Sequence, residues 1–228
     1  MLRCGGLLLF PLDLPAARLR SLEALLDQTE RERAGRFLAA VHRDRFIAAH
    51  GILREQLGAL LDMEPAVLEF IAAEHGKPQL AGAAAGSGID FNLSHSGDLA
   101  LLGWSQGRHI GVDLEVWRHM TDATALVRRF FSLSENAAYA ALAESDRERG
   151  FFECWTRKEA YIKAIGRGLG LPLDSFDVSF GRGRPAALLR QAVADGRTWS
   201  LSGLDLDHGM SGAVVLEADS CHVLAAAA

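Results

Sequence analysis

The apolar pattern of the first sixty residues predicts a short strand followed by three helices. Residues 5–10 form an apolar run typical of a buried strand, and helices are expected at about 16–27, 29–40 and 43–61. In the last helix, residues at spacings of three and four form one apolar face. That face consists of Phe46, Ile47, His50, Leu53, Leu57, Leu60 and Leu61, with Arg45, Arg54 and Glu55 on other sides.

The next fifty residues have the pattern of an antiparallel sheet. A strand-like run at 68–73 leads to a Gly-Pro turn at 75–78, and the Ala- and Gly-rich residues 81–88 read as a surface connector. Two strand-like runs then surround a turn at 94–97, and another strand is expected at 110–117.

The second half repeats the outline of the first. Helices are expected at 122–131, 133–145 and 150–165, a strand at 174–180, and two final strands around a turn at 207–212. The repeat predicts an α+β fold of two pseudo-symmetric lobes, each a small antiparallel sheet packed on a long helix. We expect residues 1–108 to form the N-terminal lobe and 109–228 the C-terminal lobe, with the active site between them.

Composition narrows the class of protein. No apolar run among the 228 residues is long enough to span a membrane, and the first residues do not resemble a signal peptide, so we expect a cytoplasmic protein. The net charge of −5 argues against general nucleic-acid binding. The stretch from Arg18 to Arg54, however, contains eight arginines and only five carboxylates. This excess of positive charge fits either a solvated helix face or an anion-binding face.

The cysteines do not indicate a disulfide framework or a thiolate metal site. Cys4, Cys154 and Cys221 are odd in number and lie far apart. Ordinary buried or unused thiols are expected.

One predicted strand carries two carboxylates on the same face. Side chains alternate along a strand, so Asp113 and Glu115 project together. Such a pair repels itself unless a proton or a cation relieves it, and oxygen ligands suit Mg²⁺. A solvated edge strand is the plainer interpretation of the same pattern.

The helix around residues 151–163 carries further charged groups. Trp155, Glu159 and Lys163 lie four residues apart on one side. Glu159 and Lys163 can form an ordinary helical ion pair of about 0.3 to 0.5 kcal/mol. Lys158 and Lys163 flanking Glu159 can equally clamp a metal-bound phosphate.

Two shorter motifs add weaker candidates. His95 lies on a turn after Ser94, where a single histidine is more often structural than functional. Lys77 precedes Pro78 on another turn and is a candidate phosphate contact.

Taken in order, these motifs resemble the Sfp-type 4′-phosphopantetheinyl transferases of the holo-acyl-carrier-protein synthase superfamily. The form W-x-x-K-E-A is that of the W/KEA variety of the family. The matching segments are HGKP at 75–78, FNLSHS at 91–96, GVDLE at 111–115 and WTRKEAYIK at 155–163, with a softer match, FFSLSE, at 130–135.

The resemblance implies an activity and its partners. It implies a monomeric enzyme that binds coenzyme A between two lobes and moves its 4′-phosphopantetheine arm to a serine of an apo acyl or peptidyl carrier protein. Adenosine 3′,5′-bisphosphate is the expected second product. The resemblance implies no nucleic-acid or membrane partner.

The resemblance also implies roles for individual residues. Asp113, Glu115 and Glu159 look like ligands of Mg²⁺, and Glu159, Lys163 and Asp113 look like the catalytic groups. Glu159 is the candidate general base, although a metal-bound water or Asp113 would serve as well. The expected coenzyme A contacts are Lys158 and Lys163 at the phosphates and Lys77, Ser94 and His95 at the nucleotide end. Arg45, another expected contact, matches the family's arginine ahead of the long helix, and Arg33 falls near the family's basic helix.

Two other functions remain open from the sequence. An inactive descendant would bind carrier proteins or coenzyme A only, but every expected metal carboxylate and both lysines are present. A different Mg²⁺ enzyme, such as a nucleotide hydrolase, would use water in place of the carrier serine. The chain has no Walker or dinucleotide-binding glycine motif to support it.

Overall fold

The structure is a computed structural model that describes residues 5–193, 196–207 and 209–217. Cys4 and Cys221, and His208 of the predicted last turn, lie outside these residues. The N-terminal half contains β1 (Gly5–Pro11), α1 (Ala16–Glu23), α2 (Gln28–Gly35), α3 (Ala40–Leu61), β2 (Glu69–Ala72), β3 (Pro78–Ala81), β4 (Ile89–Ser96) and β5 (Leu99–Gln106). The C-terminal half contains β6 (Ile110–Val116), α4 (Ala123–Phe130), α5 (Leu133–Ala140), α6 (Glu144–Ile165), β7 (Asp177–Val178), β8 (Leu188–Arg190), β9 (Trp199–Gly203) and β10 (Met210–Glu217).

The two halves have the same strand order. The first sheet runs β1-β5-β4 and the second runs β6-β10-β9, so in each sheet the last strand in sequence lies in the middle. All these pairs are antiparallel. Each half also has one helix of 22 residues, α3 and α6. The predicted α+β fold of two pseudo-symmetric lobes is confirmed.

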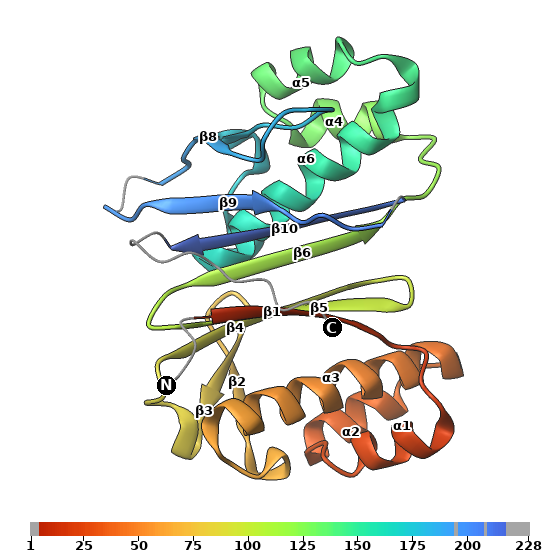
Figure 1. The fold of residues 1–228 in the computed structure, drawn as a ribbon, viewed down its shortest axis with the longest axis vertical. Helices are drawn as coiled ribbons and strands as arrows, with labels where there is room; N and C mark the ends of the chain where they lie inside the picture. The colour runs from red at the N-terminus through yellow and green to blue at the C-terminus, as the bar shows by residue number, and fades with distance from the viewer. Residues whose placement is uncertain (1–4, 194–195, 208, 218–228) are drawn as a thin grey trace.

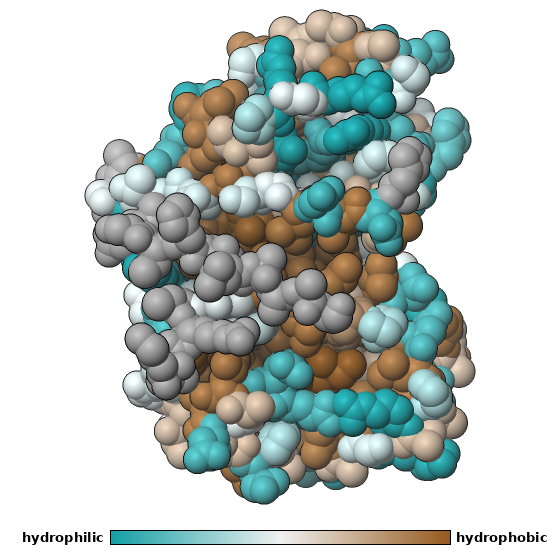
Figure 2. All heavy atoms as spheres, in the orientation of Figure 1, coloured by the Kyte–Doolittle hydropathy of each residue, from teal (hydrophilic) through white to brown (hydrophobic). Residues whose placement is uncertain are grey.

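The two sheets lie in the middle of the molecule and the helices lie outside them (Figure 1). Helices α1 to α3 cover the first sheet, and α4 to α6 cover the second. On the face seen in Figure 2, apolar residues gather across the middle, over the strands, while hydrophilic residues line the helices below. The chain passes from one sheet to the other between Gln106 and Ile110. The predicted boundary at residue 108 falls in this turn and stays a prediction.

Each lobe has its own apolar core, and a third, smaller cluster joins them. Residues of α3 such as Ile47 and Leu57 pack with Phe91 of β4 in the first core, and Phe152 and Tyr161 of α6 belong to the second. The cluster between the lobes consists of Leu7, Leu101, Ile110, Val112, Leu114, Val214 and Leu216.

Several predicted boundaries were wrong. Helix α6 begins at Glu144 and not near residue 150, and Gly150 lies inside it, at a point where a side chain would collide with Leu142. Helix α2 ends at Gly35, five residues early. The short strands β3 and β8 were not predicted, and the predicted connector 81–88 contains the end of β3 and a helical turn at Gly82–Ala84.

Arg54 also differs from the prediction that it lies off the apolar face of α3. Its side chain is fully buried, and its guanidinium donates to Glu30 and Asp27 at the start of α2 and to two backbone carbonyls. The charge is buried because each donor has an acceptor. Among the described residues, no helix is long and apolar enough to cross a membrane.

Candidate active site

The site lies where α6 crosses β6, and a glycine makes the crossing close. A Cβ atom on Gly111 would lie 2.1 Å from the carbonyl oxygen of Ala160 and 2.3 Å from the amide nitrogen of Ala164. Only a residue without a side chain therefore allows α6 to lie directly on β6 at this point. The contact brings Glu159 and Lys163 of the helix beside Asp113 and Glu115 of the strand, and all four line one open cavity of about 360 Å³.

Asp113 is the most buried of these carboxylates, with 5% of its surface exposed. Its Oδ1 accepts hydrogen bonds from Lys163 Nζ (2.6 Å) and Ser94 Oγ (2.8 Å). Its Oδ2 is buried and has no hydrogen-bond partner among the described residues. Burial raises the pKa of Asp113 and the charge of Glu115 adds to the rise, although Lys163 and Ser94 oppose it.

The other two carboxylates differ in their partners. Glu115 Oε2 accepts from Ser96 Oγ at 2.8 Å and from Arg118 at 3.1 Å. Burial raises the pKa of Glu159, and the negative charge of Asp113 raises it further, while Lys163 opposes the rise. Three carboxylates around one cavity with one ammonium group leave excess negative charge, which a cation would relieve.

The fit of Mg²⁺ to this cavity was tested on its donor atoms. In the described part of the chain, no group of three or more His, Cys, Asp or Glu side chains is arranged so that it could hold a metal ion as it stands. The ammonium group of Lys163 forms an ion pair with Asp113 and already supplies positive charge to this carboxylate. The donors are nevertheless the hard oxygen atoms that Mg²⁺ prefers, and the unpartnered Asp113 Oδ2 is the kind of buried oxygen that a cation satisfies. The residues present therefore fit the ion.

A second cavity, of about 580 Å³, continues from Glu115 and His95 into the first lobe. Arg45 lies on its wall, where it donates to both oxygens of Asp13 (2.7 and 2.9 Å) and to the carbonyl of Gly97 (2.8 Å). Burial lowers the pKa of His95, and the charge of Lys163 lowers it further. The remaining basic groups on this wall are Arg33, His42, His50 and Arg118, so two of the eight arginines between Arg18 and Arg54, Arg33 and Arg45, line this cavity.

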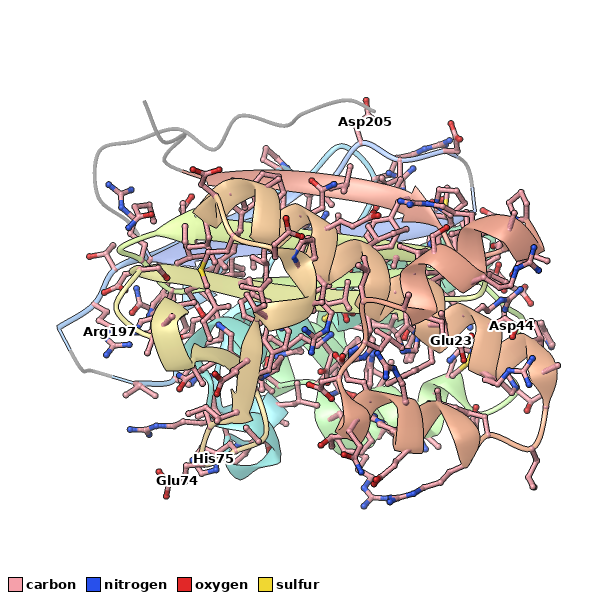
Figure 3. All side chains as sticks on the ribbon, turned by 90° about the horizontal axis from the view of Figure 1, so that it is seen from below. Glu23, Asp44, Glu74, His75, Arg197 and Asp205 are labelled. Carbon is pink, nitrogen blue, oxygen red and sulfur yellow. The ribbon has the colours of Figure 1, made fainter. Side chains whose placement is uncertain are left out.

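A third cavity, of about 280 Å³, opens on the other side of Glu159 and Lys163. The turn between β2 and β3, with Glu74 and His75, lies beside the end of α6 (Figure 3), and the carbonyl oxygen of His75 is close to Gly168. Lys77 lies on the wall, but its Nζ donates to Asp90 Oδ2 (2.7 Å) and to the carbonyl of Ile110 (2.8 Å). Burial lowers the pKa of Lys77. Lys77 therefore bridges the lobes as well as lining the cavity.

The expected phosphate contact of Lys158 was wrong. Its side chain is fully buried in the C-terminal lobe, with Nζ 2.7 Å from Glu135 Oε2 and bonded to the carbonyl oxygens of Leu173 and Phe176. Successive residues of a helix point about 100° apart, so Lys158 faces the core while Glu159 faces the cavity. No donor of Lys158 is left for a ligand.

Several residues of the site were missed. Asn92, Ser96 and Arg118 were not singled out, although all three line the cavities. A signal was present for two of them. Asp90, Asn92, Ser94 and Ser96 alternate with Phe91, Leu93 and His95, which indicates one uniformly polar face of the strand.

Comparison with known proteins identifies the family. The profile of the 4′-phosphopantetheinyl transferase superfamily matches residues 109–215, and that of the N-terminal part of 4′-phosphopantetheinyl transferases matches residues 16–106. The chain is thus a member of the 4′-phosphopantetheinyl transferase superfamily.

Named relatives agree with this family. The 4′-phosphopantetheinyl transferase HetI of Nostoc sp. is 40% identical over 206 residues, which cover 90% of this chain and 84% of HetI. A phosphopantetheinyl transferase of Thraustochytrium sp. is 34% identical, with coverage of 90% of this chain and 74% of that protein. The 4′-phosphopantetheinyl transferase Sfp of Bacillus subtilis is 28% identical, with coverage of 68% and 66%. The predicted Sfp-type resemblance is confirmed.

A search of solved structures gives a more distant similarity. A holo-(acyl-carrier-protein) synthase from Bacillus anthracis in complex with CoA (3′,5′-ADP) superposes with a TM-score of 0.40 and 19% identity. The superposition covers 48% of this chain and 94% of that chain.

Proposed function

We propose that this transferase moves the 4′-phosphopantetheine group of coenzyme A to a serine hydroxyl of an apo acyl or peptidyl carrier protein and releases adenosine 3′,5′-bisphosphate. The observation that carries the proposal is the meeting of three carboxylates and one ammonium group, Asp113, Glu115, Glu159 and Lys163, on one open cavity. Phosphoryl transfer depends mainly on positioning and on electrostatic stabilisation, and this cluster supplies both.

The continuity of the three cavities supports an extended, multiply charged ligand. The first cavity, which holds the three carboxylates, shares Glu159 and Lys163 with the third cavity beside Lys77. It also shares Glu115 and His95 with the second cavity, the basic cavity of the first lobe. The coenzyme A contacts in this proposal are Lys77, Ser94, His95, Arg45 and Lys163. Arg33, which also lines the basic cavity, lies where a phosphate of the nucleotide would be neutralised.

Mg²⁺ would be held by Asp113, Glu115 and Glu159. When bound, the ion supplies positive charge to the pyrophosphate oxygens and neutralises the carboxylates. The unpartnered Oδ2 of Asp113 supports this assignment. The raised pKa of both Asp113 and Glu159, which comes mainly from burial and in part from the neighbouring carboxylates, supports it as well.

Glu159, Lys163 and Asp113 have separate roles in the transfer. Glu159 accepts the proton of the carrier serine, because its carboxylate lies on the wall of the open cavity beside Lys163 and Asp113. The serine oxygen forms its bond to phosphorus while the bond from that phosphorus to the leaving nucleotide's oxygen breaks. Lys163, held at 2.6 Å from Asp113, places positive charge beside the phosphate oxygens. Asp113 orients Lys163.

Intact-protein mass spectrometry tests the function. Apo fatty-acid, polyketide and peptide carriers are incubated separately with the enzyme, coenzyme A and Mg²⁺, with EDTA in a parallel set. We expect at least one carrier to gain the mass of a single phosphopantetheinyl group, and EDTA to prevent the gain. A folded enzyme that modifies none of them would contradict the transfer, and a gain that resists EDTA would contradict the Mg²⁺ requirement.

We also propose that the monomer is the working unit, because residues of both lobes of one chain line the cavities. Light scattering during size-exclusion chromatography measures the mass. A cytoplasmic location stays a prediction from the sequence.

A further inference from the structure

The polar side chains of β4 form a ladder along one edge of β6. Strand β6 pairs with β10 on one side only, so the backbone N–H groups on its other side need acceptors. Side chains of β4 provide them. Ile110 N donates to Asp90 Oδ2 (2.8 Å), Val112 N to Asn92 Oδ1 (2.8 Å), Leu114 N to Ser94 Oγ (3.3 Å) and Val116 N to Ser96 Oγ (3.0 Å).

The ladder fixes one strand relative to the other. Every rung joins residues 20 positions apart in the sequence, so β4 and β6 run in the same direction with a constant register. A shift of one residue would turn the polar face of β4 away from β6. The contact between the lobes is therefore specified by four side chains.

The two serine rungs also contact a carboxylate. Ser94 Oγ donates to Asp113 Oδ1 and Ser96 Oγ donates to Glu115 Oε2, both at 2.8 Å. A hydroxyl has one proton and two lone pairs. Because the N–H of β6 occupies a lone pair of each serine, the proton is directed to the carboxylate that precedes that N–H in the sequence.

From this geometry we infer that Ser96 is a positioning residue for Glu115, as Ser94 is for Asp113. Each serine binds one carboxylate oxygen and fixes its orientation, and it leaves Asp113 Oδ2 and Glu115 Oε1 without a hydrogen bond from the described chain. The inference rests on the proposed function in so far as these oxygens bind a divalent cation. Groups that orient metal ligands in this way contribute strongly to metal affinity.

Titration with Mn²⁺ alone, followed by electron paramagnetic resonance of the free ion, measures the site without turnover. We expect Ser96→Ala to weaken Mn²⁺ binding by about 10-fold or more. Ser96→Thr keeps the hydroxyl and should restore the wild-type affinity. Asn92→Ala is the matched control, because it also removes an acceptor for β6 but touches no carboxylate. It should lower the melting temperature and weaken Mn²⁺ binding by much less than Ser96→Ala does.

The outcomes separate this inference from the function. If Ser96→Ala lowers the melting temperature as Asn92→Ala does but binds Mn²⁺ as tightly as the wild type, Ser96 is only a rung between the lobes and the inference fails. It fails as well if the wild type transfers phosphopantetheine but does not bind Mn²⁺, in which case the transfer still stands. A 10-fold loss of Mn²⁺ binding in Ser96→Ala, with no carrier modified by the wild type, would support the positioning role and contradict the function.

Discussion

At the residue scale, two lysines of one helix have opposite environments. Lys158 Nζ is enclosed by Glu135 and two carbonyl oxygens, while Lys163 lies on the wall of the open cavity. Glu135 also accepts from the amides of Ser132 and Val178, so it joins the start of α5, the middle of α6 and β7. The buried pair therefore holds the elements of the C-terminal lobe together, and Lys163 is left for chemistry.

Replacement of each lysine by methionine should separate these two roles. Lys158→Met leaves the carboxylate of Glu135 buried without its ammonium partner and should lower the free energy of unfolding by about 3 to 5 kcal/mol. Lys163→Met also removes the ammonium partner of the buried Asp113, but Lys163 is partly exposed and Ser94 still donates to Asp113. It should therefore lower stability less than Lys158→Met does, and lower kcat/KM about 100-fold. Urea unfolding and transfer kinetics measure the two effects. If Lys158→Met had wild-type stability and weakened coenzyme A binding, the structural role of Lys158 would be contradicted and a phosphate contact would be supported.

Glu159 should lower the melting temperature of the metal-free enzyme although transfer requires it. It is surrounded by negative charge and accepts no hydrogen bond within the described part of the chain, so Glu159→Gln should raise the melting temperature of the enzyme in EDTA. The same variant should lose transfer by at least about 100-fold if Glu159 is the base. Glu148→Gln, at an exposed position of the same helix, is the control and should change neither. A Glu159→Gln enzyme with near-normal turnover would remove Glu159 from the proposed mechanism.

At the element scale, the crossing of α6 over β6 sets the position of the charged cluster. The backbone of α6 lies so close to Gly111 that no side chain fits between them. Helix α6 ends at Gly166, which has a φ of 75° and donates its N–H to Ile162, so the chain turns away after Lys163. The close crossing and the helix end together determine which turn of α6 faces Asp113.

Gly111→Ala should test this crossing. The added Cβ would lie 2.1 Å from Ala160 O, which forces the helix away from the strand. We expect a loss of stability of about 1 to 3 kcal/mol and a larger loss of transfer than the stability change explains. Thermal unfolding and kcat/KM measure both. Gly35→Ala is the control, since a Cβ there meets no atom within 4 Å. Full activity in Gly111→Ala would show that the crossing tolerates movement.

The short pair β7 and β8 should respond to acid. Burial opposes the shift, but hydrogen bonds from Arg190 and the neighbouring serines lower the pKa of Asp177 to about 2. An acid with a lowered pKa stabilises the fold above its unfolded value, near 3.9, and loses that contribution as pH falls through its folded value. Asp177→Asn should therefore be less stable than the wild type by about 0.5 to 1 kcal/mol at pH 7. The difference should shrink as the pH falls from 4 towards 2, as measured by urea unfolding. A difference that stays constant over this range would contradict the ion pair.

At the scale of the whole molecule, the lobes share both apolar and polar contacts. The cluster that contains Leu101 joins the two sheets, and the ladder of β4 satisfies the edge of β6. Lys77 and Asp90 meet at Ile110, the first residue of β6. Because the charged cluster takes residues from both lobes, its geometry depends on this contact.

Leu101→Ala should show that the lobes unfold together. Removal of this buried side chain from the cluster between the lobes should cost about 2 to 5 kcal/mol. We expect one thermal transition, shifted to lower temperature, in both circular dichroism and tryptophan fluorescence. Leu133→Ala, at a position that is 91% exposed, should leave the transition unchanged. Two separate transitions in Leu101→Ala would mean that the lobes are independent.

The sequence alone predicted most of the elements and the members of the charged cluster. Alternation placed Asp113 and Glu115 on one face of a strand, and helical spacing placed Glu159 and Lys163 on one side of a helix, because both patterns depend on local backbone geometry. The repeat of the two halves likewise predicted the two lobes. These features needed no knowledge of contacts between distant residues.

Only the tertiary structure decided how the elements meet. Local spacing did not distinguish Lys158 from Lys163, because the buried acceptors of Lys158 come from Glu135, Leu173 and Phe176. Neither the buried Arg54 nor the second contact of Ser96 was predicted, since each depends on a partner about 20 or more residues away. Sequence periodicity determines which side of an element is polar, whereas the partner of each polar group is set by how the chain folds back on itself.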